Sequence, residues 1–408
     1  MTNHWVDIKN ADVILIMGSN AAENHPIAFK WVEAAKERGA TLISVDPRYT
    51  RTSAMADLYA PLRSGTDIVF LGGMINYAIQ RGRIHRSYIS EYTNASFLLD
   101  PAFGFKDGYF TGWDPEKKVY DRATWKYQLG ADGTPAQDKS LRDAHSVFQH
   151  LRRHFARYTP EMVEQICGTP KDQFLKVAEA FTSTGSPNKA GTVLYAMGWT
   201  QHSKATQLIR TAAILQLLLG NVGVAGGGVL ALRGLSNVQG STDMGLLWNS
   251  LPGYLTLPNA KAHPGLKEYL EKETPKSGYW VNKPKFFVSL LKAWYGEAAS
   301  KENDFAFHYL PKVGAPYTHM DIFEAMYAGT IKGFIVAGQN PAVSGPNSTL
   351  ERKALEKLDW LVVRDLFETE TAAFWKGPGV DPAKVKTEVF LLPAASHLER
   401  EAIQEPPV

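Results

Sequence analysis

Short apolar runs that end in small polar or charged residues recur along the chain, and helical patterns separate them. The expected strands cover residues 12–17, 41–46, 192–197, 229–232, 333–337, 360–365 and 388–393. Strands that alternate with helices predict an α/β fold with parallel sheets. We expect two Rossmann-like parallel-sheet domains that face a shared cofactor cleft.

Start and stop signals place the helices between these strands. Pro26 opens a helix in which Ile27, Trp31 and Ala35 recur on one apolar face. Thr66 is expected to cap a helix over residues 67–80, and Ser348 with Glu351 has the spacing of a capping box. The other expected helices cover 146–157, begin at Pro160 and Pro170, end at Leu219 and cover 284–295.

Two segments depart from this alternation. Residues 99–145 show little periodicity, yet their aromatic side chains need burial, so we expect an ordered insertion; these side chains are Phe103, Phe105, Tyr109, Phe110 and Trp113. Five glycines between 220 and 228 imply positive φ angles or close backbone approach. The predicted domains are 1–240 with this insertion, 241–385 as part of a second α/β domain, and 386–408 as a strand and tail.

Composition narrows the class of protein. The 408 residues are 44% hydrophobic and 21% charged, which is typical of globular proteins with two or three domains. A net charge of +3 does not favour nucleic acid as a partner, and neither a membrane-spanning run nor a signal peptide is visible. Cys167 is the one cysteine, so a disulfide or a cysteine-built iron–sulfur or zinc site is excluded within the chain, and we expect it to be buried.

The strand ends carry the candidate chemistry, because ligands of open parallel sheets bind there. Residues 18–20 (Gly-Ser-Asn) can present backbone N–H groups to a pyrophosphate or a base edge. Asp46 can accept hydrogen bonds from a ribose or a guanine edge, and Arg48 and Arg51 suit phosphate. The alternative for 46–48 is a solvated turn. A single glycine at this turn argues against a nicotinamide dinucleotide.

The third strand end, 198–202, offers a hydroxyl, an amide and an imidazole. For His202, hydrogen bonding is favoured over catalysis. Arg233 either orients a small carboxylate such as formate or forms a salt bridge. His150 and His154 have the spacing of a two-histidine metal site, but neighbouring arginines disfavour a cation, so no metal site is predicted. Hydrolase and P-loop motifs are lacking.

Segments 18–23, 46–52, 63–67, 198–203, 231–240 and 365–371 together resemble the large catalytic subunit of respiratory formate dehydrogenase, of the formate dehydrogenase-N type. The resemblance covers the chain from Met1 to about Arg400. This branch of the molybdopterin oxidoreductases carries two molybdopterin guanine dinucleotides with molybdenum or tungsten. The resemblance implies that formate is oxidised to carbon dioxide and that its electrons pass to an iron–sulfur cluster.

The same resemblance implies residue roles. Arg233 would position formate. The implied cofactor-binding residues are Gly18, Ser19, Asn20, Glu23, Asp46, Arg48, Arg51, Ser64, Gly65, Asp67, Gly198, Trp199, Thr200, Gln201 and His202 in the first domain, and Gly338, Gln339, Asn340, Asp365 and Thr369 for the second dinucleotide.

Departures from the family pattern predict a fragment. The cluster-binding cysteines, the cysteine or selenocysteine ligand of molybdenum and the catalytic histidine of the family precede the matching region, and a further domain follows residue 400. We expect an internal piece of a selenoprotein, inactive alone, whose start follows a selenocysteine codon read as a stop. Implied partners are the missing parts of the subunit, an iron–sulfur subunit and a membrane cytochrome b, in periplasmic anaerobic respiration. The alternatives are a non-catalytic nucleotide-binding module and, less favoured, a dehydrogenase that uses free NAD.

Overall fold

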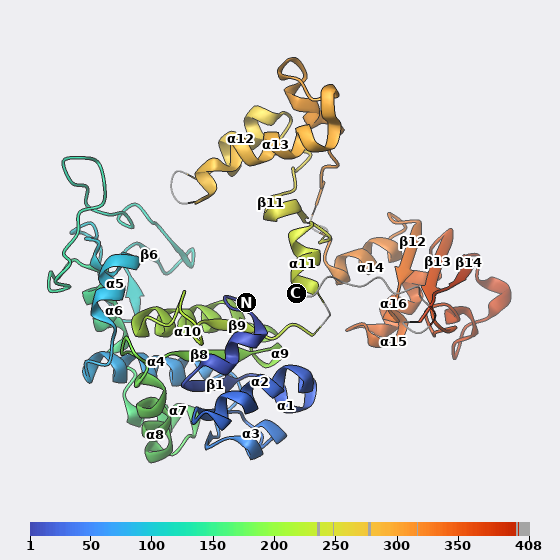
Figure 1. Ribbon diagram of the computed structural model, residues 1–408. Helices are drawn as coiled ribbons and strands as arrows, with labels where there is room; N and C mark the ends of the chain where they lie inside the picture. Colours follow the sequence, from blue (N-terminus) through green and yellow to red (C-terminus); the bar gives the residue numbers. More distant parts are fainter. Residues whose placement is uncertain (235–236, 248, 276–278, 316, 397–398, 400–408) are drawn as a thin grey trace. The chain divides into compact units, whose positions relative to one another are not determined.

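The computed structural model describes residues 1–234, 237–247, 249–275, 279–315, 317–396 and 399. The chain forms two compact units, Met1–Val238 and Gln239–Val408 (Figure 1). Each unit contains a parallel sheet, which confirms the predicted α/β class.

Unit 1 is built on a five-stranded sheet in the order β3-β2-β1-β8-β9, and all its strand pairs are parallel. The strands are β1 (Val13–Met17), β2 (Thr41–Val45), β3 (Leu58–Ala60), β8 (Gly191–Tyr195) and β9 (Val229–Ala231). From β1 the chain first builds outward to β3, and later adds β8 and β9 on the other side of β1. The carboxyl end of β1 is therefore a topological switch point, where ligands of such sheets bind.

Helices cover both faces of this sheet, which explains why every residue of β1 is buried. Val13, Leu15 and Met17 face one hydrophobic core, and Ile14 and Ile16 face the other. The first core is covered by α4 (Asp67–Gln80), α7 (Pro160–Cys167), α8 (Lys171–Thr182) and α10 (Ala205–Leu219), and the second by α2 (Pro26–Glu37) and η1 (Trp5–Asn10). The other helices of this unit are α1 (Ala21–Asn24), α3 (Arg51–Met55), α5 (Arg86–Tyr92), η2 (Asn94–Ser96), α6 (Val147–Phe155) and α9 (Met197–Thr200).

The glycine-rich loop before β9 packs directly on the first residues of the chain. Gly226 and Gly228 have φ angles of +74° and +90°, and an added Cβ would lie 2.4 Å from the Asn10 carbonyl carbon and 2.0 Å from Thr2 Oγ1. Thr2 Oγ1 accepts a hydrogen bond from the Val229 N–H at 2.9 Å. Both reasons predicted for the glycines, positive φ and close approach, are confirmed.

The insertion over residues 99–145 is ordered. It contains two short hairpins, β4 (Phe105–Lys106) with β5 (Tyr109–Phe110) and β6 (Trp113–Asp114) with β7 (Val119–Tyr120). The Phe103 ring lies edge-on to His150 of α6 with centroids 5.0 Å apart, and the Phe110 ring stacks on His154 at 5.5 Å. Aromatic packing against α6 therefore holds the insertion, as predicted, although Tyr109 stays half exposed.

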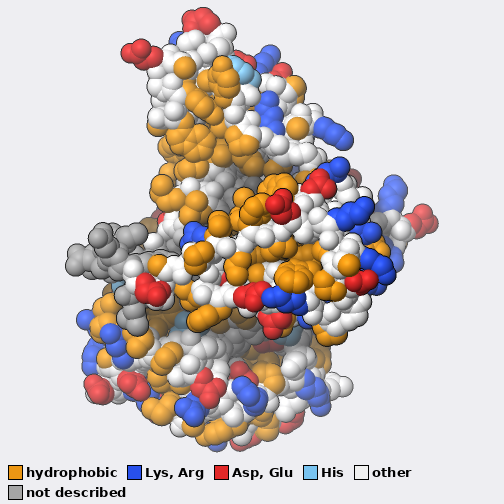
Figure 2. All heavy atoms as spheres, turned by 90° about the vertical axis from the view of Figure 1, so that its right-hand side faces the viewer, with side chains coloured by type: hydrophobic (Ala, Val, Ile, Leu, Met, Phe, Trp, Pro, Cys, Tyr) orange, Lys and Arg blue, Asp and Glu red, His pale blue; other side chains and the backbone are white. Residues whose placement is uncertain are grey.

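Unit 2 contains a three-stranded parallel sheet in the order β12-β13-β14, formed by β12 (Gly333–Ala337), β13 (Trp360–Asp365) and β14 (Glu388–Pro393). One face packs on α14 (His319–Tyr327), α15 (Pro341–Ser344) and α16 (Ser348–Leu355). On the other face Ile335 and Phe390 are exposed by 65% and 45%. Figure 2 views the molecule from the side of these strands and shows hydrophobic side chains among charged ones.

The rest of unit 2 includes a small helical core centred on Tyr269 and Phe287. It is formed around α12 (Leu266–Glu273) and α13 (Lys283–Tyr295). The remaining elements are α11 (Val238–Asp243), β10 (Ser250–Leu251), η3 (Pro252–Tyr254), β11 (Leu255–Thr256), η4 (Tyr279–Asn282), η5 (Gly296–Ala298), η6 (Lys301–Tyr309), η7 (Phe374–Lys376) and η8 (Pro382–Lys384).

Three local predictions were wrong. Ile27 is 77% exposed, and α2 instead buries Phe29, Val32 and Ala35. The Thr66 hydroxyl makes no cap hydrogen bond and donates to the Arg63 carbonyl at 2.6 Å. Helix α16 is capped by the Asn347 side chain, with Ser348 already inside the helix. For α2 and α16 a neighbouring residue took the predicted place, whereas Thr66 keeps the N-cap position of α4 without a side-chain cap hydrogen bond.

Two further observations concern the lengths of the described helices and the C-terminal strand. Among the described residues, no helix has both the length and the hydrophobicity that crossing a bilayer requires. The predicted C-terminal strand is β14, which pairs with β13 in the sheet of unit 2. Leu235, Ser236 and most of the predicted tail (397–398 and 400–408) lie outside the described residues.

Candidate functional site

A cleft of about 610 Å³ lies at the carboxyl ends of β1, β2 and β8 in unit 1. The switch point of the sheet is therefore hollowed, as expected for a ligand site. The lining residues are Gly18, Ser19, Asn20, Asn24, His25, Asp46, Pro47, Arg48, Thr50, Ser64, Asp67, Ala196, Met197, Gly198, His202, Leu232 and Gly234.

Two glycines that line the cleft allow the ends of β1 and β8 to approach each other closely. The Gly18 carbonyl accepts hydrogen bonds from the backbone N–H groups of Ala196 and Gly198, at 3.2 and 3.0 Å. Gly18 has a φ of +72°, and an added Cβ would lie 2.4 Å from Trp199 Cδ1. A Cβ on Gly198 would lie 2.7 Å from the Gly18 oxygen. Glycine is thus required at both positions by packing alone.

Trp199 supports the cleft from below. Its side chain is fully buried, stacks on Tyr195 with centroids 5.0 Å apart, and donates from Nε1 to the Asp67 carboxylate at 3.1 Å. Burial raises the pKa of Asp67, while hydrogen bonds and the nearby His202 oppose that rise. The sequence predicted Trp199 as a cofactor contact, but the indole does not line the cleft and instead fixes the lining residue Asp67.

Asp46 occupies the end of β2 in a fixed orientation. One carboxylate oxygen accepts a hydrogen bond from the Arg48 N–H at 2.9 Å, and the Asp46 carbonyl accepts one from the Tyr59 hydroxyl at 3.1 Å. Burial raises the pKa of Asp46, and the Arg48 N–H and guanidinium oppose the rise. The predicted turn is present, and its acid lines a cavity, so the turn and ligand interpretations are compatible.

Ser19 offers a hydrogen-bonding group without a partner. Its side chain is 7% exposed, lines the cleft, and its Oγ makes no hydrogen bond to any described residue. A buried hydroxyl that is unpaired costs free energy unless a ligand or water satisfies it. Together with the Asp46 and Asp67 carboxylates, this group fits a polar ligand with hydrogen-bond donors and acceptors.

Several predicted residues lie beside the cleft without lining it. Arg51 forms an ion pair with Glu23 at 3.1 Å, so its guanidinium already has an anionic partner. The Arg233 side chain is exposed, while Leu232 and Gly234 on either side of it line the cleft. The other predicted residues outside the lining are Glu23, Gly65, Thr200 and Gln201.

Sequence reasoning missed His25. Its Nε2 lies 3.0 Å from the carbonyl oxygen of Arg233, and its ring stacks on Trp5 with centroids 5.6 Å apart. It therefore connects the α1–α2 junction to the end of β9. Its position immediately before Pro26, at a helix start, was the available signal.

Unit 2 has a strand-end cavity of its own. Its volume is about 310 Å³, and the lining residues are Gly338, Arg364, Asp365, Leu366, Ala394, Ala395 and Ser396. Gly338 has a φ of +63°, like Gly18 at the end of β1. Gln339 is exposed, and the Thr369 hydroxyl is buried without a partner among the described residues. Gly338 and Asp365 thus line one cavity, whereas Gln339, Asn340 and Thr369 do not.

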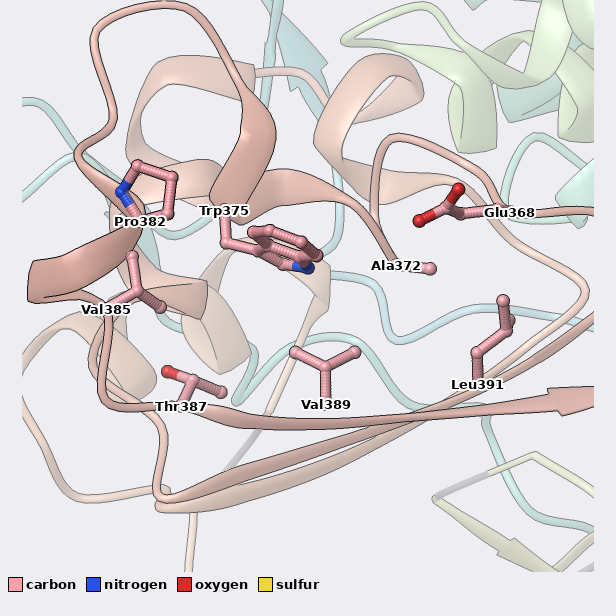
Figure 3. A pocket seen from close by; sticks show the side chains of 8 residues that line it. All are labelled: Glu368, Ala372, Trp375, Pro382, Val385, Thr387, Val389 and Leu391. Atoms are coloured by element: carbon pink, nitrogen blue, oxygen red, sulfur yellow. The ribbon is translucent and has the colours of Figure 1, made fainter.

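A second cavity of unit 2, of about 400 Å³, has different chemistry. Thr387, just before β14, and Val389 and Leu391 of β14 point to the side on which Trp375 lies (Figure 3). Its one acid, Glu368, is ion-paired with Lys376 at 2.7 Å. Apolar walls and a neutralised acid are a poor match to a phosphate-bearing ligand, so the strand-end cavities are the better candidates.

Comparisons with known proteins bear on these cavities. The sequence model of the molybdopterin oxidoreductase family matches residues 1–375. The chain belongs to the molybdopterin oxidoreductase family.

Within this family the chain is similar to three formate dehydrogenase subunits. It is 50% identical over 408 residues to formate dehydrogenase 2 subunit alpha (cytochrome c-553) of Nitratidesulfovibrio vulgaris, and 52% over 409 residues to formate dehydrogenase subunit alpha of Megalodesulfovibrio gigas. It is 51% identical over 412 residues to the nitrate-inducible formate dehydrogenase major subunit of Escherichia coli. Each alignment covers 98% of this chain and 40% of the relative, so the chain spans about two fifths of their length.

Among solved structures, acetylene hydratase from Pelobacter acetylenicus aligns with a TM-score of 0.48 and 18% identity. That alignment covers 91% of this chain and 42% of the other. A molybdopterin cofactor with molybdenum or tungsten is implied by the family itself.

Proposed function

We propose that this chain supplies two guanine-dinucleotide-binding units of a formate dehydrogenase catalytic subunit. The observation that carries the proposal is the unit 1 cleft at the switch point, whose lining includes the unpaired buried Ser19 hydroxyl and the Asp46 and Asp67 carboxylates. The identity of about 50% to formate dehydrogenase subunits supports the substrate.

The residues present fit the dinucleotide form of the cofactor. In unit 1, Asp46, Ser64 and Asp67 would accept or donate hydrogen bonds at the nucleoside, and Arg48 would neutralise phosphate. Ser19 would gain the partner that it lacks. In unit 2, Gly338 and Asp365 hold the equivalent strand-end positions and would serve a second dinucleotide.

Arg233 would act on formate. An exposed guanidinium at the end of β9 can bind both oxygens of a small carboxylate and fix its orientation. Oxidation of formate to carbon dioxide releases one proton and two electrons, and the molybdopterin-bound metal would supply the two-electron acceptor. We further propose the selenoprotein character, the iron–sulfur and cytochrome b partners, and the periplasmic respiratory setting that the family resemblance implies.

A nucleotide titration tests the proposal on the 408-residue chain. We expect isothermal titration calorimetry to detect two sites for guanosine diphosphate (GDP). Inosine diphosphate lacks the exocyclic amino group of guanine, and 2′-deoxy-GDP lacks the ribose 2′-hydroxyl, so each lacks one hydrogen-bond donor that Asp46 could engage. The analogue that binds weakly to the unmodified chain lacks the donor that Asp46 engages. Its affinity for the unmodified chain should therefore match the affinity of GDP for the Asp46→Asn variant. Absence of GDP binding contradicts the dinucleotide function.

The same titration separates the competing nucleotide-binding module. Such a module would bind adenosine diphosphate as well as GDP, because nothing in it would need to select a guanine-tailed pterin. Preference for GDP, together with formate oxidation by the assembled subunit, supports the oxidoreductase.

A further inference from the structure

A hydrogen-bonded arrangement connects two strand-end loops of unit 1. The Thr52 hydroxyl donates to Asn20 Oδ1 at 2.9 Å and accepts from the Ala22 N–H at 3.0 Å. The Thr52 N–H also donates to Asn20 Oδ1, at 3.3 Å. We name this arrangement the Asn20–Thr52 clamp. It joins the loop that follows β1 to the first turn of α3, after β2.

Unit 2 contains the same three hydrogen bonds. The Thr371 hydroxyl donates to Asn340 Oδ1 at 2.8 Å and accepts from the Ala342 N–H at 3.2 Å. The Thr371 N–H donates to Asn340 Oδ1 at 3.1 Å. This Asn340–Thr371 clamp joins the loop after β12 to the loop after β13.

The two clamps also agree in sequence spacing and backbone conformation. Each asparagine comes two residues after a glycine of positive φ, Gly18 or Gly338. Each threonine comes six residues after the strand-end aspartate, Asp46 or Asp365. Asn20 and Asn340 have similar backbone angles, with ψ of 68° and 65°. Equal geometry at two separate places argues against a chance contact.

The clamps leave little capacity for direct ligand binding by the asparagines. A carbonyl oxygen has two lone pairs, and both donors on each Oδ1 come from threonine. Each Nδ2 donates to a carboxylate, that of Glu23 for Asn20 and that of Glu370 for Asn340. Thr52 and Thr371 are fully buried. The two threonines do not line the strand-end cavities, whereas Asn20 lines the unit 1 cleft with its hydrogen-bonding groups largely engaged within the protein.

We propose that Thr52 and Thr371 are positioning residues for nucleotide binding. Each holds its pair of strand-end loops in the binding geometry, and Asn20 and Asn340 act through the threonine. This inference deepens the proposed function and rests on it. It assigns a role to the last residue of segments 46–52 and 365–371, for which the family resemblance implied none.

The test compares valine with serine at each position in the 408-residue chain. Valine keeps the shape of threonine but removes both the donor and the acceptor, whereas serine keeps both. We expect Thr52→Val to weaken GDP binding at one of two calorimetric sites by about five- to tenfold, because a buried hydrogen bond and its partners are lost. Thr371→Val should weaken the other site, and the two serine variants should bind within about twofold of the unmodified chain.

Thr182→Val is the matched control. Its hydroxyl is also fully buried, but donates to the Ala178 carbonyl within α8, outside the residues that line the cleft. It should lower stability without changing GDP affinity. GDP binding by both clamp valine variants at unmodified affinity, or serine variants as weak as valine variants, would overturn the inference.

A second measurement separates this inference from the proposed function. If the unmodified chain binds no GDP, the proposed function fails, and amide hydrogen exchange then decides on the clamp. Thr52→Val should accelerate exchange of the Ala22 and Thr52 amides, and Thr52→Ser should not. Unchanged exchange in the valine variant overturns the clamp itself.

Discussion

Replacing Gly18 by alanine tests whether the floor of the cleft is as tightly packed as its geometry indicates. An alanine Cβ would lie 2.4 Å from Trp199 Cδ1 and 2.8 Å from Cγ, at a φ of +72°. The indole has little freedom to move, because it is fully buried and bonded to Asp67. Left-handed backbone strain costs about 1–2 kcal/mol, and overpacking adds about 1–3 kcal/mol. The expected loss in free energy of unfolding is about 2–5 kcal/mol.

Gly39→Ala separates the two contributions. Gly39 has a φ of +94°, but an added Cβ has no atom within 4 Å, so only the strain of about 1–2 kcal/mol applies. Urea unfolding followed by tryptophan fluorescence measures both variants, and GDP titration measures the effect on the cleft. The reasoning is refuted if Gly18→Ala costs no more than Gly39→Ala, or if it leaves GDP affinity unchanged.

Other predictions concern pH, the cysteine and the arginine. Burial, aided by Arg153 and His145 for His150 and by Arg157 for His154, lowers the pKa of both histidines to about 4 from 6.5. The folded chain therefore binds fewer protons there, so its free energy of unfolding is fully retained above pH 6.5 and falls as the pH drops toward 4. Urea unfolding at several pH values should show that fall, and the His150→Phe, His154→Phe double variant should flatten it. Cys167 is fully buried and donates to the Thr66 carbonyl at 3.5 Å, so it is not available as a metal ligand. The 408-residue chain should not reduce a dye with formate, and dye reduction at enzyme rates would contradict this. In the subunit assembled with its cofactor, Arg233→Ala should lower kcat/KM for formate about ten- to hundredfold, because a charge-assisted hydrogen-bonded pair is lost. The kcat/KM of the Arg233→Lys variant should lie between that of Arg233→Ala and that of the unmodified subunit. An unchanged kcat/KM for Arg233→Ala in steady-state assays would exclude the assigned role.

The strands and their polar ends were predictable because each depends on a local pattern. Every residue of β1 is buried, so it had to be continuously apolar, and the small residues that follow mark where it meets the ligand edge. The same logic identified Asp46 and Gly338, which line cavities. What such patterns report is the strand and its end, not the partner of each side chain.

The partners were not predictable, because they depend on loops that come together only in the fold. Segment 46–52 belongs to the family resemblance, but the sequence alone does not show that Thr52 is buried and bonds to Asn20, more than thirty residues away. Arg51 was expected to bind phosphate because the strand-end pattern contained it, but Glu23 lies within ion-pair distance. The predicted buried face of α2 was wrong for a similar reason, because the surroundings of the helix in the fold bury Phe29 and leave Ile27 exposed.

The packing of the glycine-rich loop on the first ten residues has a consequence for experiments on this protein. Val229 starts β9, and its N–H is bonded to Thr2; Gly226 donates to Asp7 at 2.8 Å. A shortened chain that starts after Asn10 would lose these bonds and leave β9 without support at its beginning. Because Leu232, directly beyond β9, is one of the residues that line the unit 1 cleft, the first ten residues support part of that lining from outside it. Deletion of these residues is therefore expected to disturb the lining of that cleft.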